Sequence, residues 1–150
     1  MSTKEVAKIA VAVVGARGYT GLELCRILSK HPQIALRKVY ATGDFRLSDY
    51  MSDKGAAEVA TGKMENLALE ARDYKVVFLA TPHEVSIDLA PELLRAGCHV
   101  IDLSGAFRLQ EGDESIRRER FQKWYKIEHK ALDLVGEAVF GLSPFAQREV

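Results

Sequence analysis

Three glycines recur at every third position in the segment "VVGARGYTGLEL", as Gly15, Gly18 and Gly21, and Thr20 adds a hydroxyl beside the last of them. Free backbone N–H groups at the start of a helix attract anions, and glycine lets a phosphate group approach the backbone closely. The spacing differs from the commoner Gly-x-Gly-x-x-Gly of dinucleotide-binding proteins. The segment predicts a site for the pyrophosphate of a dinucleotide, and the alternative is a tight turn that binds nothing.

The segments on either side of these glycines fit a phosphate-binding turn. The valine-rich run 8–15 predicts a buried parallel strand, and apolar residues recur at helical spacing over 20–32, where Pro32 ends the pattern. A second strand is predicted at 34–42, further buried strands at 75–82 and 98–105, and helices at 84–97 and 114–129. The segment 66–71 suggests a short strand, whereas 43–66 has no clear pattern.

This alternation of strands and helices predicts an α/β fold, a three-layer Rossmann-like open sheet that is mainly parallel and has helices on both faces. A length of 150 residues fits one domain. Ligands of such sheets bind beyond the carboxyl ends of the strands. The residues that directly follow each predicted strand are therefore the candidates for a site.

Composition excludes several classes of function. Lysine plus arginine and aspartate plus glutamate both number 21, so no net charge attracts nucleic acid or a membrane surface. The sequence lacks a membrane-spanning run and a signal peptide, which predicts a cytoplasmic protein without membrane contact. Cys25 and Cys98 lie in apolar surroundings and predict small buried side chains, with no disulfide and no metal site.

The residues after the second predicted strand should distinguish NAD from NADP. An acidic residue there favours the free ribose hydroxyl of NAD, and an arginine favours the 2′-phosphate of NADP. This chain offers both, as Asp44 and Arg46, just after Thr42. Each charge has the alternative of being a solvated loop residue.

The segment 117–130 carries six arginines and lysines between aromatic residues. A nucleic-acid surface is one interpretation. Phe121, Trp124 and Tyr125 fall at i, i+3 and i+4 on one helix face, so a packed amphipathic helix explains them without a ligand. We favour the helix and expect no nucleic acid partner.

Five segments in order, "GARGYTG", "VVFLATPHEVS", "IDLSGAFRL", "KWYKIEH" and "AVFGLSPF", resemble the N-acetyl-gamma-glutamyl-phosphate reductases of arginine biosynthesis, whose wider relatives are the aspartate-semialdehyde dehydrogenases. The resemblance covers nearly the whole chain. It implies a reductase that uses NADPH on a small acyl phosphate. In that chemistry a cysteine thiolate displaces phosphate to form a thioester, and hydride reduces the thioester to the aldehyde.

The resemblance also assigns residues. Those that match the dinucleotide loop are Gly15, Arg17, Gly18, Tyr19, Thr20 and Gly21, and those that match the nicotinamide end are Ala80 and Pro82. Together with the strand-end argument it favours NADP, bound with the help of Thr42 and Arg46. Ser104 and Arg108 match a segment near the family's substrate site, where a guanidinium binds phosphate or carboxylate, and an ion pair with Asp102 is the alternative for Arg108.

Two polar residues follow the predicted strand 75–82, as His83 and Ser86. A histidine in this place could act as a catalytic base, but we interpret His83 as a hydrogen-bonded loop residue. Ser86 is either part of the family motif or a helix cap.

The chain departs from this family where the chemistry is concentrated. The family's nucleophile lies in an Asn-Pro-Gly-Cys motif after the segment "AVFGLSPF", and neither Cys25 nor Cys98 matches it. The catalytic histidine of the family is not matched either. We therefore expect 1–150 to be the dinucleotide-binding domain, with no catalytic residue of its own, of an enzyme that is a homo-oligomer at full length. The alternatives are a stand-alone dinucleotide-binding module and a domain of an aspartate-semialdehyde dehydrogenase.

Overall fold

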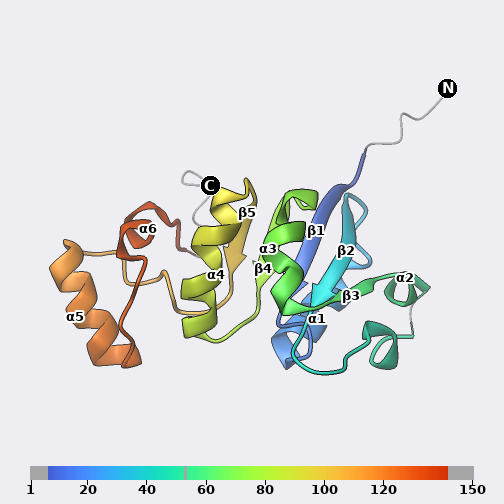
Figure 1. Ribbon diagram of the computed structural model, residues 1–150, viewed down its shortest axis with the longest axis horizontal. Coiled ribbons are helices and arrows are strands. Elements are labelled where there is room, and N and C mark those ends of the chain that lie inside the picture. The colour runs from blue at the N-terminus through green and yellow to red at the C-terminus, as the bar shows by residue number, and fades with distance from the viewer. Residues whose placement is uncertain (1–6, 53, 142–150) are drawn as a thin grey trace.

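A sheet of five parallel strands forms the centre of the molecule (Figure 1). The structure is a computed structural model that describes residues 7–52 and 54–141. The strands are β1 (Ile9–Val14), β2 (Ile34–Tyr40), β3 (Ala60–Gly62), β4 (Val76–Leu79) and β5 (His99–Asp102). Their order is β3-β2-β1-β4-β5, and every neighbouring pair is parallel. This confirms the predicted α/β fold, with the reversal of strand order between β1 and β4, where ligands of such sheets bind.

Helices connect and cover the strands. They are α1 (Tyr19–Leu28), α2 (Lys54–Ala57), α3 (Leu67–Glu70), α4 (His83–Arg95), α5 (Glu114–Tyr125) and α6 (Leu132–Glu137). Short 3₁₀ turns are η1 (Leu47–Asp49), η2 (Met64–Asn66) and η3 (Ala71–Asp73). The four predicted strands and the three longer helices are all present within a few residues of their expected bounds. The prediction that 98–105 is a buried strand is wrong in its burial, because β5 lies at the edge of the sheet and Ile101 is 46% exposed.

Alternate residues of β1 point to opposite faces of the sheet and enter two separate cores. Val11 and Val13 pack with Cys25 and Leu28 of α1, together with the segment around η1 and α2. Ala12 and Val14 pack on the other face, against residues of α3, η3 and α4. A strand that is buried on both faces must be apolar throughout, which explains the unbroken valine-rich run.

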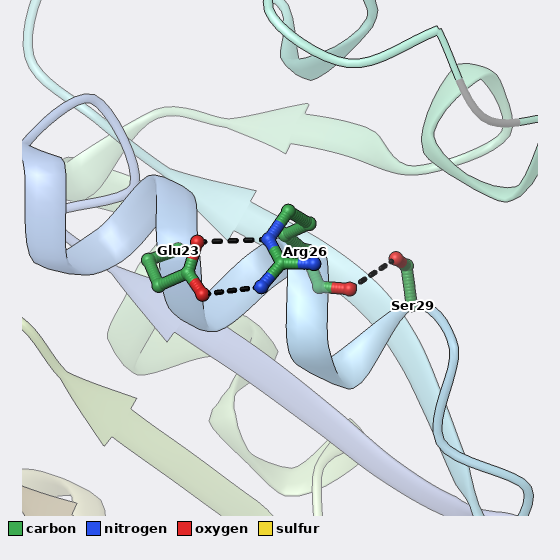
Figure 2. A network of polar contacts seen from close by, with 3 residues as sticks. All are labelled: Glu23, Arg26 and Ser29. Atoms are coloured by element: carbon green, nitrogen blue, oxygen red, sulfur yellow. Dashed lines mark hydrogen bonds and ion pairs between the residues drawn. The ribbon is translucent and has the colours of Figure 1, made fainter.

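The outward side of α1 is polar and solvent-exposed. Arg26 donates from Nε and Nη2 to the two carboxylate oxygens of Glu23, at 2.8 and 2.5 Å, and the hydroxyl of Ser29 donates to the carbonyl of Arg26 (Figure 2). This arrangement lowers the pKa of Glu23, chiefly through the hydrogen bonds from Arg26. It places a cation in the last turn of α1, where it complements the helix dipole whose positive end lies at Gly18.

The segment 66–71, for which the sequence suggested a strand, is helical instead. Leu67 and Ala71 are buried one helical turn apart, whereas Leu69 is 82% exposed. The third strand of the sheet is β3, inside the stretch that showed no pattern. A Cβ on Gly62 would lie 2.5 Å from the ring of Tyr40, so a glycine is needed where β3 crosses that ring.

The described segment from 103 to 141 contains α5 and α6, which pack against each other. Phe121 is fully buried against Leu132 and Val135, and Tyr125 packs beside it. Trp124 is 69% exposed, so the prediction that all three aromatic residues share one packed face holds only for Phe121 and Tyr125. Within the described ranges, no helix combines the length and apolar character that crossing a membrane demands.

A partly buried polar network lies under β2 and the turn that follows β1. The hydroxyl of Tyr40 donates to the carboxylate of Glu70 and lies 2.8 Å from the hydroxyl of Tyr74. Lys38 donates to the same carboxylate at 2.8 Å. The carbonyl of Tyr40 accepts the N–H groups of Gly15 and Ala16, at 2.9 and 3.2 Å. The network therefore fixes the position of Tyr40, whose carbonyl holds the glycine turn.

Glu70→Gln should destabilise the protein at neutral pH and less in acid. The hydrogen bond from Lys38, followed by the one from Tyr40, lowers the pKa of Glu70. A lowered folded-state pKa stabilises the protein above the unfolded value of about 4.3, and this contribution disappears as the pH falls through the folded-state value. We expect a loss of about 1 kcal/mol in the free energy of unfolding at pH 7, measured by urea titration.

The matched control is Glu65→Gln, because Glu65 is an exposed carboxylate of the same segment whose ion pair with Lys63 spans 4.0 Å. It should leave the unfolding midpoint nearly unchanged. An equal loss for Glu70→Gln at pH 3 and pH 7 would show that the charge of Glu70 does not contribute.

Candidate functional site

The turn after β1 lies against the end of β4, at the reversal of strand order. Gly15 has a φ of +84°, and a Cβ there would lie 2.2 Å from the carbonyl oxygen of Ala80. No side chain fits between these atoms, and a positive φ strains other residues. The structure thus brings the glycine turn and Ala80 together, as the sequence assignment requires.

The other two glycines of the turn differ from each other. A Cβ on Gly21 would lie 2.2 Å from the carbonyl oxygen of Gly15, so Gly21 lets α1 pack onto the turn. The nearest described atom to a Cβ on Gly18 is 3.6 Å away, an ordinary contact. Gly18 has φ −73° and ψ 160°, which any residue adopts. The described fold needs glycine at 15 and 21 but not at 18.

The N-terminus of α1 is open to an anion. Gly18 is the N-cap residue, and within the described chain no side chain caps the helix and no acidic residue lies in its first turn. The N–H groups of a first helical turn have no carbonyl partner inside the helix. Tyr19 is 96% exposed, and Arg17 and Thr20 are exposed beside it. A phosphate group placed over Gly18 would meet these N–H groups and the positive end of the helix dipole.

A cavity of about 770 Å³ lies at the carboxyl ends of β2 and β3. Thr42, Asp44, Arg46 and Lys63 line it. The guanidinium of Arg17 reaches this end of the sheet, with Nη1 3.5 Å from the carbonyl oxygen of Thr42. Glu65 also lines the cavity, so three cations and two carboxylates surround the place where the second strand ends. The sequence did not indicate Lys63 as a site residue, because Lys63 follows β3 and that strand has no recognisable sequence pattern.

The carboxylate of Asp102 organises the ends of β4 and β5. It accepts from the hydroxyls of Ser86 and Ser104, at 2.8 and 2.7 Å, and from the N–H of Ser104 at 3.0 Å. The hydroxyl of Thr81 lies 2.8 Å from that of Ser86. Ser86 is fully buried and joins α4 to β5, so it is not a helix cap. Pro82 occupies the N-cap position of α4 and is exposed.

Arg108 is exposed and lies apart from Asp102. It donates from Nη2 to the carbonyl of Leu103 at 3.0 Å, and its guanidinium lies 5.4 Å from the centroid of the Phe140 ring. None of the described contacts pairs it with Asp102, whose oxygens the serines occupy. Arg108 and Ser104 line a second cavity of about 810 Å³ along the edge of β5. The structure thus brings these two residues together, but in a different cavity from Thr42 and Arg46.

The hydrogen bonds of His83 limit its chemistry. Its Nδ1 accepts the N–H of Gly105 at 2.9 Å, so the proton of the neutral ring lies on Nε2. His83 is hydrogen-bonded as expected, but it is the first residue of α4 and not a loop residue.

Neither cysteine has the exposure of a nucleophile. Cys25 is fully buried, and burial raises the pKa of its thiol to about 12. Burial also raises the pKa of Cys98, whose thiol donates to the carbonyl of Ala71 at 3.1 Å. A thiol attacks as its thiolate, so both are structural residues. Among the residues that the structure describes, no group of three or more histidine, cysteine or carboxylate side chains is placed to hold a metal ion.

The sequence is similar to curated reductases over most of its length. It is 40% identical over 145 residues to N-acetyl-gamma-glutamyl-phosphate reductase of Bordetella bronchiseptica. The aligned region covers 95% of this chain and 39% of that protein. It is 42% identical over 137 residues to the enzyme of the same name from Herminiimonas arsenicoxydans, over 89% of this chain and 37% of that protein. The chain spans about two fifths of the length of the curated relatives it matches.

Solved structures share the fold at lower identity. The aspartate semialdehyde dehydrogenase II of Vibrio cholerae, complexed with ASA, superposes with a TM-score of 0.55 at 19% identity, over 68% of this chain and 32% of that one. The aspartate semialdehyde dehydrogenase of Candida albicans with NADP gives 0.54 at 21% identity, over 68% and 31%.

The last of the five sequence motifs, "AVFGLSPF", continues past Gly141 and so lies partly outside the described residues.

A family model matches nearly the whole chain. The model for the NAD-binding domain of semialdehyde dehydrogenases matches residues 10–150. With the order of the strands and the glycine turn at their reversal, this match establishes that the chain belongs to the semialdehyde dehydrogenase NAD-binding domain family.

Proposed function

We propose that this chain is the NADP(H)-binding domain of an N-acetyl-gamma-glutamyl-phosphate reductase, which reduces N-acetylglutamyl phosphate to N-acetylglutamate semialdehyde and releases phosphate. The observation that carries the nucleotide site is Gly18. It is a glycine that the described fold does not need, and it lies at an uncapped helix N-terminus. The names of the relatives at about 40% identity support the choice of substrate.

In this proposal the pyrophosphate of the nucleotide lies over Gly18 and accepts hydrogen bonds from the N–H groups of Tyr19, Thr20 and Gly21. The nicotinamide end follows the turn toward Ala80 and Pro82, because Gly15 touches Ala80. When bound, NADPH supplies the hydride. The residues of the chain bind and orient it.

The cavity at the end of β2 would take the adenosine half of the nucleotide. Arg17 and Arg46 offer guanidinium groups to a 2′-phosphate, and Lys63 adds a third cation at the rim. Asp44 and Glu65 oppose this choice, because both line the cavity and a carboxylate repels a phosphate. The excess of cations favours NADP over NAD.

Ser104 and Arg108 would bind the phosphate or a carboxylate of the substrate. Arg108 is exposed and has donor groups beyond the one that it gives to Leu103. The thioester-forming cysteine of this chemistry would come from a catalytic domain outside residues 1–150, because Cys25 and Cys98 are buried. That domain would also carry the contacts between subunits.

Gly18→Val should abolish nucleotide binding and leave the fold intact. The branched side chain fits the backbone of Gly18 but would occupy the place of the pyrophosphate. We expect NADPH affinity, measured by fluorescence titration, to fall at least about 100-fold, because several charge-assisted hydrogen bonds are lost together. The melting temperature should change by only a few degrees.

The control for this variant is Gly21→Ala, whose Cβ would meet the carbonyl of Gly15. It should lower the melting temperature markedly. Unchanged NADPH affinity in Gly18→Val would mean that the turn has no ligand.

The chain should bind NADP more tightly than NAD, as measured by calorimetry. Arg46→Gln should reduce this preference, and Asp44→Asn should increase it, by about twofold to fivefold each, because both charges are exposed. Neither variant should change NAD affinity much. Tighter binding of NAD than of NADP by the parent chain would show that the cavity at the end of β2 was misinterpreted.

The protein expressed from its natural gene should oxidise NADPH with N-acetylglutamyl phosphate and not with aspartyl phosphate, followed by the absorbance of the nicotinamide. A preference for aspartyl phosphate would place it with the aspartate-semialdehyde dehydrogenases instead. NADPH binding without turnover of either compound would indicate a binding module.

A further inference from the structure

Two histidine rings form hydrogen bonds with the backbone of the turn that follows β5. His83, the first residue of α4, accepts the N–H of Gly105 on its Nδ1 at 2.9 Å. His129 contacts the next residue of the turn, with Nε2 2.7 Å from the carbonyl oxygen of Ala106. This turn carries Ser104 and Arg108, so the two rings bear directly on where those side chains lie.

The hydrogen bonds show which nitrogen of each ring is the acceptor. The N–H of Ala131 donates to Nδ1 of His129 at 3.1 Å, so Nε2 carries the proton and donates to Ala106. His129 is 2% exposed and lies between the rings of Phe107 and Phe121, and burial lowers its pKa. In each ring, Nδ1 therefore accepts a backbone N–H.

Packing at Gly105 leaves the turn little freedom. A Cβ on Gly105 would lie 2.5 Å from the hydroxyl oxygen of Tyr125, so the backbone of the turn lies directly against that ring. The same tyrosine ring packs edge-on against His83, with 4.7 Å between centroids. Below the turn, Asp102 accepts from Ser104, and the hydroxyl of Ser104 accepts the N–H of Ala106 at 3.0 Å.

We propose that His83 is a positioning residue, which ties the end of β4 to the turn after β5 and so sets Arg108 at a fixed place relative to the nicotinamide end of the nucleotide, with His129 holding the neighbouring carbonyl of Ala106. The proposal rests on the role of Arg108 in the proposed function. His83 follows Ala80 and Pro82 directly on the chain, so one side chain links the cofactor end of β4 to an anion-binding arginine 25 residues further on.

The hydrogen-bond pattern predicts which substitutions preserve this role. Asparagine places a side-chain oxygen near the position of Nδ1 and accepts the same N–H, whereas leucine has a similar volume and no acceptor. His83→Asn should therefore keep the turn in place, and His83→Leu should release it. His31→Leu is the matched control, because Nδ1 of His31 also accepts a backbone N–H, from Gln33 at 3.2 Å, in the connection between α1 and β2.

The experiment measures three quantities on each variant of the 150-residue chain. NADPH affinity is measured by fluorescence, and exchange of the Gly105 amide hydrogen by NMR. Inorganic phosphate is titrated against the Nε–H resonance of Arg108 with NADPH at saturation. For His83→Leu we expect exchange at Gly105 to rise about tenfold and phosphate affinity to fall about fivefold, as the loss of one hydrogen bond allows. NADPH affinity should stay within twofold, and His83→Asn and His31→Leu should resemble the parent.

Three results would overturn the proposal. Unchanged exchange and phosphate affinity in His83→Leu would show that the bond to Gly105 does not hold the turn. Equal losses in His83→Asn and His83→Leu would assign the effect to packing on Tyr125 rather than to the acceptor. A parent chain in which phosphate does not shift the Arg108 resonance would remove the role of Arg108, and the positioning role with it, even if NADPH binds.

The proposed nucleotide site and the proposed role of His83 can be tested separately. A parent chain without NADPH affinity contradicts that site, whereas exchange of the Gly105 amide needs no nucleotide and still decides whether His83 holds the turn.

Discussion

The close approach of Gly15 to the carbonyl of Ala80 is the constraint on which the candidate site depends. It brings the end of β1 against the end of β4, at the place where the order of the strands reverses. Because a Cβ at Gly15 would lie 2.2 Å from that carbonyl, the chain can turn there only with glycine. Gly21 is constrained in the same way, because a Cβ there would lie 2.2 Å from the carbonyl oxygen of Gly15, and its small size lets α1 pack on the turn. These two contacts determine where the N-terminus of α1 lies relative to the ends of β1 and β4.

Two polar networks hold the surroundings of this turn, one on each side. Tyr40 accepts the N–H groups of Gly15 and Ala16 with its carbonyl, and its hydroxyl is anchored on Glu70. Across the sheet, Asp102 joins α4 to the turn after β5 through Ser86 and Ser104. Buried carboxylates and hydroxyls are stable only when they are hydrogen-bonded, so each network has one favourable arrangement and confers rigidity. A rigid frame lowers the entropic cost of ordering a bound ligand.

The sequence predicts those parts of the structure that depend on local pattern. Strands β1 and β4 are apolar throughout because both of their faces are buried, and the glycine spacing predicted the turn. The three residues of β3 have no pattern of their own, since pairing with β2 and the fit of Gly62 on Tyr40 place them. In 66–71 the alternation of Leu67, Leu69 and Ala71 resembled a strand. Contacts between distant segments, such as the one between His83 and Gly105, have no sequence signal.

The central claim is that the uncapped N-terminus of α1 binds the pyrophosphate of a dinucleotide. The most direct test is an NMR titration of the isotope-labelled chain with NADPH, observing backbone amides. We predict the largest shifts at Gly18, Tyr19, Thr20 and Gly21, with smaller shifts at Thr42 and Ala80. Shifts confined to the cavity along the edge of β5, with those four amides unchanged, would contradict the claim.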